Sequence, residues 1–200
     1  RSINTIAVKL SISPIGNGNA RAGRNKIVAL AKAMGLRTPL PDTPSLPIGA
    51  DEVTVLDHTG AFATFPNGGM AVWPHAALEV RTATGQVIWR ADRDGRKPVR
   101  VMPAQVAADM NMMLNKAVEE GTGRRTIIPG VKTSGKTGTT NAYRDAWFNG
   151  YSGNMVSAIW VGNDDYAPTN RMTGGSLPGM IWQQIMAYAH QGIEIKPYPG

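Results

Sequence analysis

The sequence predicts an α/β fold of the α+β type, in which helices cover an antiparallel sheet. Two observations carry this prediction. Apolar residues recur at helical spacing through the first half of the chain, whereas strand-like segments cluster between Val131 and Gly162. An amphipathic segment from about Pro178 to Ala189 follows the strands, and its apolar face is expected to lie on the sheet. The alternating strand and helix order of a parallel, doubly wound sheet is missing.

Each helix expected before the sheet is bounded by residues that start or stop helices. The expected ranges are Ile6–Ser13, which continues from Ser2 and Asn4 and ends at Pro14; Asn25–Met34, stopped by Gly35; a helix capped by Asp51 that reaches about Phe65; and Pro103 to about Glu120, stopped by Gly121. The stripes expected to be buried are Val106, Met110, Met113, Leu114 and Ala117 in the helix that Pro103 opens, and Met180, Ile181, Ile185, Met186 and Ala189 in the last helix.

Alternation of apolar and polar residues marks the strands. In the range Met70–Ala91, alternating apolar and polar residues lie on both sides of Thr84 and Gly85. This pattern predicts a hairpin with a half-exposed face. Two further apolar segments, Ala146–Tyr151 and Met155–Gly162, are joined by a short polar turn and predict two neighbouring strands. The sheet is therefore expected late in the chain.

Composition narrows the class of protein. Residues 1–200 are expected to form one domain or part of one, and the formal net charge of +7 comes from basic residues scattered among acidic ones rather than from one run. A solvated basic surface explains that pattern better than a nucleic-acid-binding module. The chain has no cysteine, and His58, His75 and His190 lie too far apart in sequence to suggest a metal site. No apolar run reaches the roughly 18 residues of a membrane span.

The segment Gly130–Thr137 matches the Walker A spacing of nucleotide-binding loops. Such a loop needs a buried strand before it and a helix directly after its lysine and threonine, so that the helix N-terminus faces the phosphate. Here a short stretch broken by Pro129 precedes it, and a glycine and hydroxyl residues with poor helix propensity follow it. A P-loop-type nucleotide-binding protein is therefore the alternative interpretation, and a basic nucleic-acid-binding module is another.

The same segment also contains Lys136, Thr137 and Gly138, the Lys-Thr-Gly triplet of serine enzymes that acylate on a β-lactam or on a peptide ending in D-alanine. On a strand, alternation sends the side chains of Lys136 and Gly138 to one face and those of Thr137 and Thr139 to the other, unless the strand twists at its edge. A glycine at position 138 leaves room for a substrate that lies along that edge as an added strand.

Ser2, Ile3 and Asn4 form a Ser-x-Asn triplet ahead of the Lys-Thr-Gly strand, although alone it is equally typical of a helix start. With this order, the chain resembles the C-terminal part of the transpeptidase domain of class A, bifunctional penicillin-binding proteins. The segments that carry the resemblance are Ser2–Leu10, Glu52–Gly69, Gly121–Arg124, Gly135–Tyr151 with its Arg-Asp-Ala-Trp-Phe block, Trp160–Asp165 and Thr173–Leu177. They extend over almost the entire sequence.

The resemblance implies roles for site residues. Ser2 would relay a proton between a general-base lysine and the leaving nitrogen, and Asn4 would hold the substrate amide. Lys136 would supply positive potential, while the hydroxyls of Thr137 and Thr139 would bind the substrate carboxylate. The Thr139 amide would donate to the oxyanion. Gly138 and Thr140 complete the expected substrate-binding residues, listed in chain order as Thr137, Gly138, Thr139 and Thr140.

The resemblance also implies the reaction, which is D-alanyl-D-alanine transpeptidation through a serine ester, without a metal or organic cofactor. Its expected partners are peptidoglycan stem peptides ending in D-Ala-D-Ala and β-lactam antibiotics, with no nucleic acid. None of the eight serines has lysine three residues later, so no Ser-x-x-Lys motif is present. The nucleophile is therefore expected in a missing N-terminal part of the same domain. A glycosyltransferase domain and a membrane anchor on the outer face of the cytoplasmic membrane are expected upstream.

Overall fold

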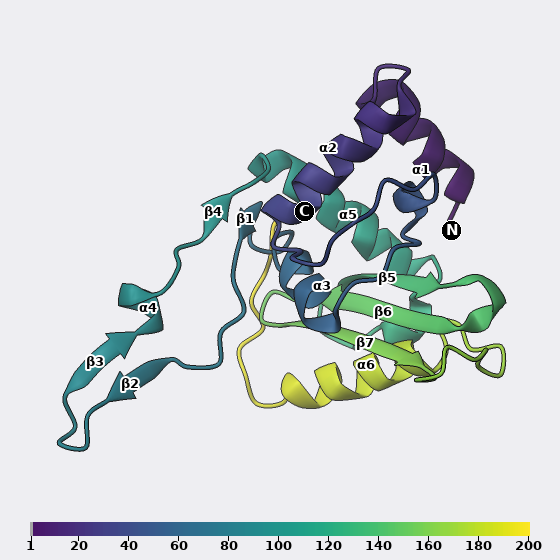
Figure 1. The fold of residues 1–200 in the computed structure, drawn as a ribbon. Helices are drawn as coiled ribbons and strands as arrows, with labels where there is room; N and C mark the ends of the chain where they lie inside the picture. The colour runs from purple at the N-terminus through teal and green to yellow at the C-terminus, as the bar shows by residue number, and fades with distance from the viewer. Residues whose placement is uncertain (1) are drawn as a thin grey trace.

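The computed structural model describes residues 2–200, and Figure 1 shows their arrangement as a helix-covered sheet with a projecting arm. The helices are α1 (Asn4–Leu10), α2 (Ala20–Ala33), α3 (Val55–Phe62), α4 (Ala91–Asp94), α5 (Ala104–Glu119) and α6 (Leu177–Ala189), with the short helical turns η1 (Ser11–Ile15), η2 (Leu46–Ile48), η3 (Arg124–Thr126) and η4 (Asn141–Tyr143). The strands are β1 (Met70–Ala71), β2 (Glu79–Arg81), β3 (Val87–Arg90), β4 (Val99–Arg100), β5 (Ser134–Thr139), β6 (Asp145–Tyr151) and β7 (Val156–Gly162).

The central sheet has three antiparallel strands in the order β5-β6-β7. Helix α6 covers one face by packing on β6 and β7, while α5 packs on β5 and α3 on β6 and β7 from the other face (Figure 1). The α+β prediction is confirmed, and the two predicted strands Ala146–Tyr151 and Met155–Gly162 agree with β6 and β7 to within one residue at each end. Since Lys136 lies within a strand and no helix follows it, the segment Gly130–Thr137 does not have the strand-loop-helix geometry of a P-loop.

The core between the sheet and α6 is centred on two aromatic rings. Phe148 on β6 and Trp182 on α6 meet edge to face, with ring centroids 5.1 Å apart, and both side chains are completely buried. The Trp182 indole also donates a hydrogen bond to the backbone oxygen of Ser157 (3.1 Å). The stripe expected on α6 is therefore partly wrong. Met186 is buried, but Ile185 is 48% exposed, because Trp182 anchors the helix with a neighbouring face.

The packing of α5 also differs from the expected stripe, because a polar residue sets its buried face. Asn111 is completely buried; its side chain accepts a hydrogen bond from the Tyr151 hydroxyl (2.6 Å) and donates one to the Phe65 oxygen (3.1 Å). Leu114 is buried as expected, whereas Met113 is 55% exposed. Asn111 can be buried because its amide group has hydrogen-bond partners inside the protein. The hydrophobicity pattern of the sequence does not reveal such partners.

Three expected helix ends are wrong; for two of them another residue supplies the capping hydrogen bond. Helix α2 begins earlier than Asn25, since the side chain of Asn19 accepts from the backbone nitrogen of Ala22 (3.0 Å). The cap of α3 is Thr54 rather than Asp51, whose carboxylate instead accepts from a threonine hydroxyl at a distance of 3.2 Å. Pro14 does not end the first helical segment, because it lies inside the wider π-helical turn η1.

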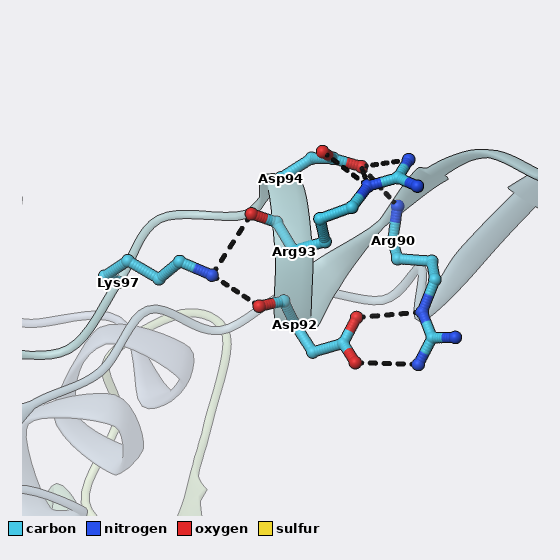
Figure 2. Close-up of polar contacts among 5 residues, drawn as sticks. All are labelled: Arg90, Asp92, Arg93, Asp94 and Lys97. Atoms are coloured by element: carbon cyan, nitrogen blue, oxygen red, sulfur yellow. Dashed lines mark hydrogen bonds and ion pairs between the residues drawn. The ribbon is translucent and has the colours of Figure 1, made fainter.

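Residues 70–101 form the arm, which leaves the body as two adjacent segments (Figure 1). The predicted hairpin is confirmed as β2 paired with β3, and an additional antiparallel pair, β1 with β4, closes its base. Figure 2 shows the ion pairs at the turn after β3, where Arg90 meets Asp92 (2.7 Å) and Arg93 meets Asp94 (2.7 Å). These contacts are exposed and join residues that are close in sequence, so they connect the arm only to itself.

No helix in residues 2–200 combines the length and the apolar character needed to cross a membrane.

Candidate active site

Strand β5 carries the Lys-Thr-Gly triplet along an unpaired edge of the sheet. Lys136 lies opposite Asn149 of β6, and Thr137 lies opposite Phe148. Paired residues of an antiparallel ladder share a face, so Thr137 and Thr139 lie on the α6 side and Lys136 and Gly138 on the other side. The alternation predicted from the sequence is confirmed.

The hydrogen-bond register fixes which backbone groups of β5 face the open edge. The Thr140 nitrogen donates to the Asp145 oxygen (3.0 Å), which makes this pair a hydrogen-bonded one. Such pairs alternate along an antiparallel ladder, so the amide and carbonyl groups of Thr137 and Thr139 point away from β6. No strand pairs with the other edge of β5 within residues 2–200. This edge therefore offers backbone donors and acceptors to an extended ligand.

Lys136 lies at that edge with its charge unpaired by a carboxylate among residues 2–200. Its side chain is half-buried, and Nζ donates to the Thr137 carbonyl oxygen at 2.8 Å. Burial lowers the pKa of Lys136 below its usual range, because the low-dielectric surroundings disfavour the charged ammonium. An anion bound at the edge would raise the pKa of Lys136 again, because it favours the charged ammonium.

The face that carries Lys136 also contains two polar atoms without partners in the described part of the chain. Asn149 lies opposite Lys136, and its buried Oδ1 accepts no hydrogen bond. His58 on α3 packs edge-on against Trp147, with ring centroids 5.6 Å apart, and its Nδ1 has no partner either. Burial lowers the pKa of His58, so its imidazole is held neutral. Other atoms of this kind in residues 2–200 belong to Asp51, Thr64, Trp73 and Arg144, so they do not by themselves distinguish this face.

The hydroxyls on the opposite face are each held by a neighbouring loop. Thr137 Oγ1 lies 2.6 Å from Thr122 Oγ1, and Thr139 Oγ1 accepts from the Gly174 backbone nitrogen at 3.1 Å. The loop at Gly174 runs so close to the sheet that a β-carbon there would lie 2.0 Å from the Trp147 oxygen. Sequence reasoning gave no role to Thr122 or Gly174, although both belong to short glycine-containing segments that signal close backbone approach.

Thr140 and Gly138 have structural environments of their own. The Thr140 hydroxyl donates to the Asp145 carboxylate (3.0 Å) and accepts from the Asp145 nitrogen (2.8 Å), which closes the turn between β5 and β6. A β-carbon at Gly138 would lie 3.2 Å from that of Trp147, tight but not prohibitive. Thr140 therefore shapes the turn.

Ser2 and Asn4 lie at the beginning of the described chain. Asn4 is the first residue of α1, whose cap residue Ile3 provides no side-chain hydrogen bond. Both side chains are exposed, and α1 packs on η1 and η2. Within residues 2–200, no hydrogen bond joins either side chain to Lys136. The structure thus brings together Lys136, Thr137 and Thr139, but it does not bring Ser2 or Asn4 into hydrogen-bond contact with them.

Comparison with known families decides how this edge is interpreted. The model of the family described as penicillin binding protein transpeptidase domain matches residues 30–187, more than half of the chain. The chain belongs to the penicillin-binding protein transpeptidase family. The matched range includes all of β5 and begins after Ser2 and Asn4.

Curated relatives agree with this membership. Penicillin-binding protein 1A of Aquifex aeolicus is 31% identical over an alignment that covers 98% of this chain and 26% of that protein. Penicillin-binding protein 1B of Haemophilus influenzae is 29% identical, covering 92% of this chain and 23% of the relative. The resemblance to class A penicillin-binding proteins inferred from the sequence is confirmed. The chain spans about a quarter of the length of these relatives.

Solved structures of penicillin-binding proteins have the same fold. The structure of Mycobacterium tuberculosis PonA1 in complex with penicillin V superposes with a TM-score of 0.76 at 25% identity, covering 97% of this chain and 58% of that chain. The imipenem acyl-enzyme complex of penicillin-binding protein A from M. tuberculosis gives a TM-score of 0.69 at 26% identity, covering 94% and 46%. Penicillin-binding protein 1A from Haemophilus influenzae, at 22% identity and a TM-score of 0.76, covers 100% and 35% and supports the fold alone.

Proposed function

We propose that this chain supplies the Lys-Thr-Gly half of a serine D-alanyl-D-alanine transpeptidase that cross-links peptidoglycan and is acylated by β-lactams. The observation that carries the proposal is the open edge of β5, where the ammonium of Lys136 and the outward amides of Thr137 and Thr139 meet. An extended stem peptide ending in D-Ala-D-Ala fits this edge as an added strand. Penicillin-binding relatives and the penicillin V complex of PonA1 support the same chemistry.

Each residue at the edge has one task in this proposal. Lys136 attracts the terminal carboxylate of the substrate from one face, and the hydroxyls of Thr137 and Thr139 reach it from the other. The Thr139 amide donates to the oxygen that becomes negative in the tetrahedral intermediate, a contact typically worth about 3 to 4 kcal/mol in the transition state. Gly138 keeps the edge open, and Thr140 holds the turn that ends it.

The serine nucleophile belongs to a Ser-x-x-Lys segment that is not among these 200 residues. Its hydroxyl attacks the penultimate carbonyl carbon, D-alanine leaves with a proton, and an amine of a second stem peptide then releases the acyl group. Ser2 passes the proton to the leaving nitrogen and Asn4 holds the substrate amide.

The cellular location follows from the proposed substrate. Peptidoglycan is assembled on the outer side of the cytoplasmic membrane, so the parent protein acts there, held by an anchor outside these residues. The sequence relatives named penicillin-binding proteins 1A and 1B support this location.

Covalent labelling of the parent protein with a fluorescent penicillin tests the proposal. The unmodified protein is expected to be labelled, and Lys136→Ala to reduce the labelling rate at least tenfold, because it removes the cation at the edge. The matched control is Lys132→Ala, which removes an exposed lysine close to β5 and is expected to label normally. Labelling of residues 1–200 in isolation, or equal rates for both variants, would refute the assignment.

A further inference from the structure

Two hydroxyls on β5 each contact a group from a distant segment of the chain. The Gly174 nitrogen contacts Thr139 Oγ1 at 3.1 Å, and Thr122 Oγ1 contacts Thr137 Oγ1 at 2.6 Å. A hydroxyl has one hydrogen to donate and two lone pairs with which to accept. The direction of these contacts therefore decides whether each threonine can still donate toward a ligand.

The direction at Thr139 is fixed by chemistry. A backbone nitrogen can only donate, so the contact from Gly174 occupies a lone pair of Thr139 and leaves its hydrogen free. The contact is rigid, because a β-carbon at Gly174 would lie 2.5 Å from the Gly138 oxygen and 2.0 Å from the Trp147 oxygen. Only glycine allows this loop to approach the strand closely enough to make Thr139 a donor.

The direction at Thr137 has two solutions. When Thr137 donates to Thr122, its only hydrogen is used and it presents lone pairs to the edge. When Thr122 donates to Thr137, the Thr137 hydrogen is free. A carboxylate only accepts hydrogen bonds, so it stabilises the second solution, in which Thr122 donates to Thr137 and Thr137 donates to the ligand. Aligned hydrogen bonds of this kind strengthen one another and are strongest when the last acceptor is charged.

The backbone around Thr122 holds its hydroxyl in place for this contact. Gly123, the next residue, donates through its nitrogen to the Ala117 oxygen (3.0 Å), which ties the segment to the end of α5. From the other side, a β-carbon at Gly175 would lie 2.4 Å from the Thr122 oxygen, so that loop also lies directly against the segment. The Thr122 side chain is itself exposed, and its removal leaves the core intact.

We infer that Thr122 is a positioning residue that makes Thr137 a hydrogen-bond donor toward the carboxylate of the substrate. Gly174 does the same for Thr139, so the two loops that contact β5 set the polarity of the anion site. The inference rests on the proposed function, because it assumes that a carboxylate binds at this edge.

The test compares Thr122→Val with Thr122→Ser in the parent protein. Valine keeps the shape and removes the hydroxyl, whereas serine keeps the hydroxyl. The second-order rate of acylation is measured with benzylpenicillin and with its methyl ester, which lacks the charged acceptor. Thr122→Val is expected to slow acylation by the free acid about tenfold, as for loss of a hydrogen bond to a charged group. Acylation by the ester is expected to change less than about twofold, and Thr122→Ser to behave as wild type.

A double-mutant cycle with Thr137→Val adds a second readout. In the Thr137→Val background, which lacks the Thr137 hydroxyl, Thr122→Val is expected to have no further effect on the rate of acylation by the free acid. If Thr122→Val slowed acylation by the acid and by the ester equally, Thr122 would have a purely structural role and the inference would be overturned. The same holds if Thr122→Val and Thr122→Ser slowed acylation by the acid equally. A wild-type protein that is not acylated at all would instead refute the proposed function, and with it the role of Thr122.

Discussion

The central sheet and the arm are stabilised in opposite ways. The sheet is held by burial, because Phe148 and Trp182 are removed from water and Asn111 satisfies its amide inside the protein. The arm has few buried groups; Leu78 is 74% exposed, and its ion pairs connect residues close in sequence (Figure 2). Burial of close-packed side chains stabilises the sheet that carries β5, whereas exposed ion pairs add little free energy. The candidate site lies on the part that is stabilised by burial.

The largest expected effect is at the aromatic core. Trp182→Ala removes the ring that covers β6 and is expected to lower the free energy of unfolding by about 3 to 5 kcal/mol. The matched control is Trp89→Ala on the arm, where the indole is only half-buried and a much smaller loss is expected. Urea unfolding of both variants measures the difference, and similar losses would contradict the contrast between sheet and arm.

The next effect distinguishes the observed face of α5 from the face expected from hydrophobicity. Asn111→Ala leaves the Tyr151 hydroxyl and the Phe65 oxygen without partners, and is expected to cost about 2 to 4 kcal/mol of unfolding free energy. Met113→Ala, at an exposed position on the same helix, is expected to change it by less than about 0.5 kcal/mol. The reverse order in thermal or urea unfolding would show that the apolar stripe is the buried face.

A smaller effect is expected from pH. Burial lowers the pKa of His58 below its usual value of 6.5, so between the folded pKa and 6.5 the unfolded state binds more protons than the folded state. The contribution of neutral His58 to the free energy of unfolding is therefore fully present above pH 6.5. It decreases as the pH falls from 6.5 to the folded pKa. His58→Phe is expected to remove this dependence, whereas the exposed His75→Gln should leave it as in wild type. Persistence of the full pH dependence in His58→Phe would refute the explanation.

The smallest effect is expected on the arm. Arg90 pairs with Asp92 at the surface, where side-chain entropy and salt screening offset most of the attraction. Asp92→Asn is expected to leave the unfolding midpoint of the whole chain unchanged, both in low salt and in 1 M salt. A clear, salt-sensitive decrease would show that these ion pairs stabilise more than the local turn.

The sequence predicted the parts of the fold that follow from short-range patterns. Strands β6 and β7, the hairpin of β2 and β3, and the limits of α5 and α6 are encoded by alternation, by turn glycines and by apolar spacing. The helix faces were predicted less well, because the buried partners of Asn111 and Trp182 come from distant segments. Caps such as Thr54 were missed because several nearby residues are equally suitable as caps.

In the candidate site, too, residues close together in sequence were predicted and residues from distant segments were missed. Lys136, Thr137 and Thr139 were found because they lie in one triplet and in the residue that directly follows it. Thr122 and Gly174 act from loops far away in sequence, and only the folded chain brings them against β5. The position of this strand at a sheet edge was predicted from Gly138 and its neighbours, and the strand order β5-β6-β7 agrees with it.

A structure of the parent protein acylated by a penicillin tests the central claim most directly. The ligand is expected to lie along β5, with its carboxylate within hydrogen-bond distance of the Thr137 and Thr139 hydroxyls and its carbonyl oxygen accepting from the Thr139 amide. A ligand bound away from β5, or a carboxylate that contacts neither hydroxyl, would contradict the account.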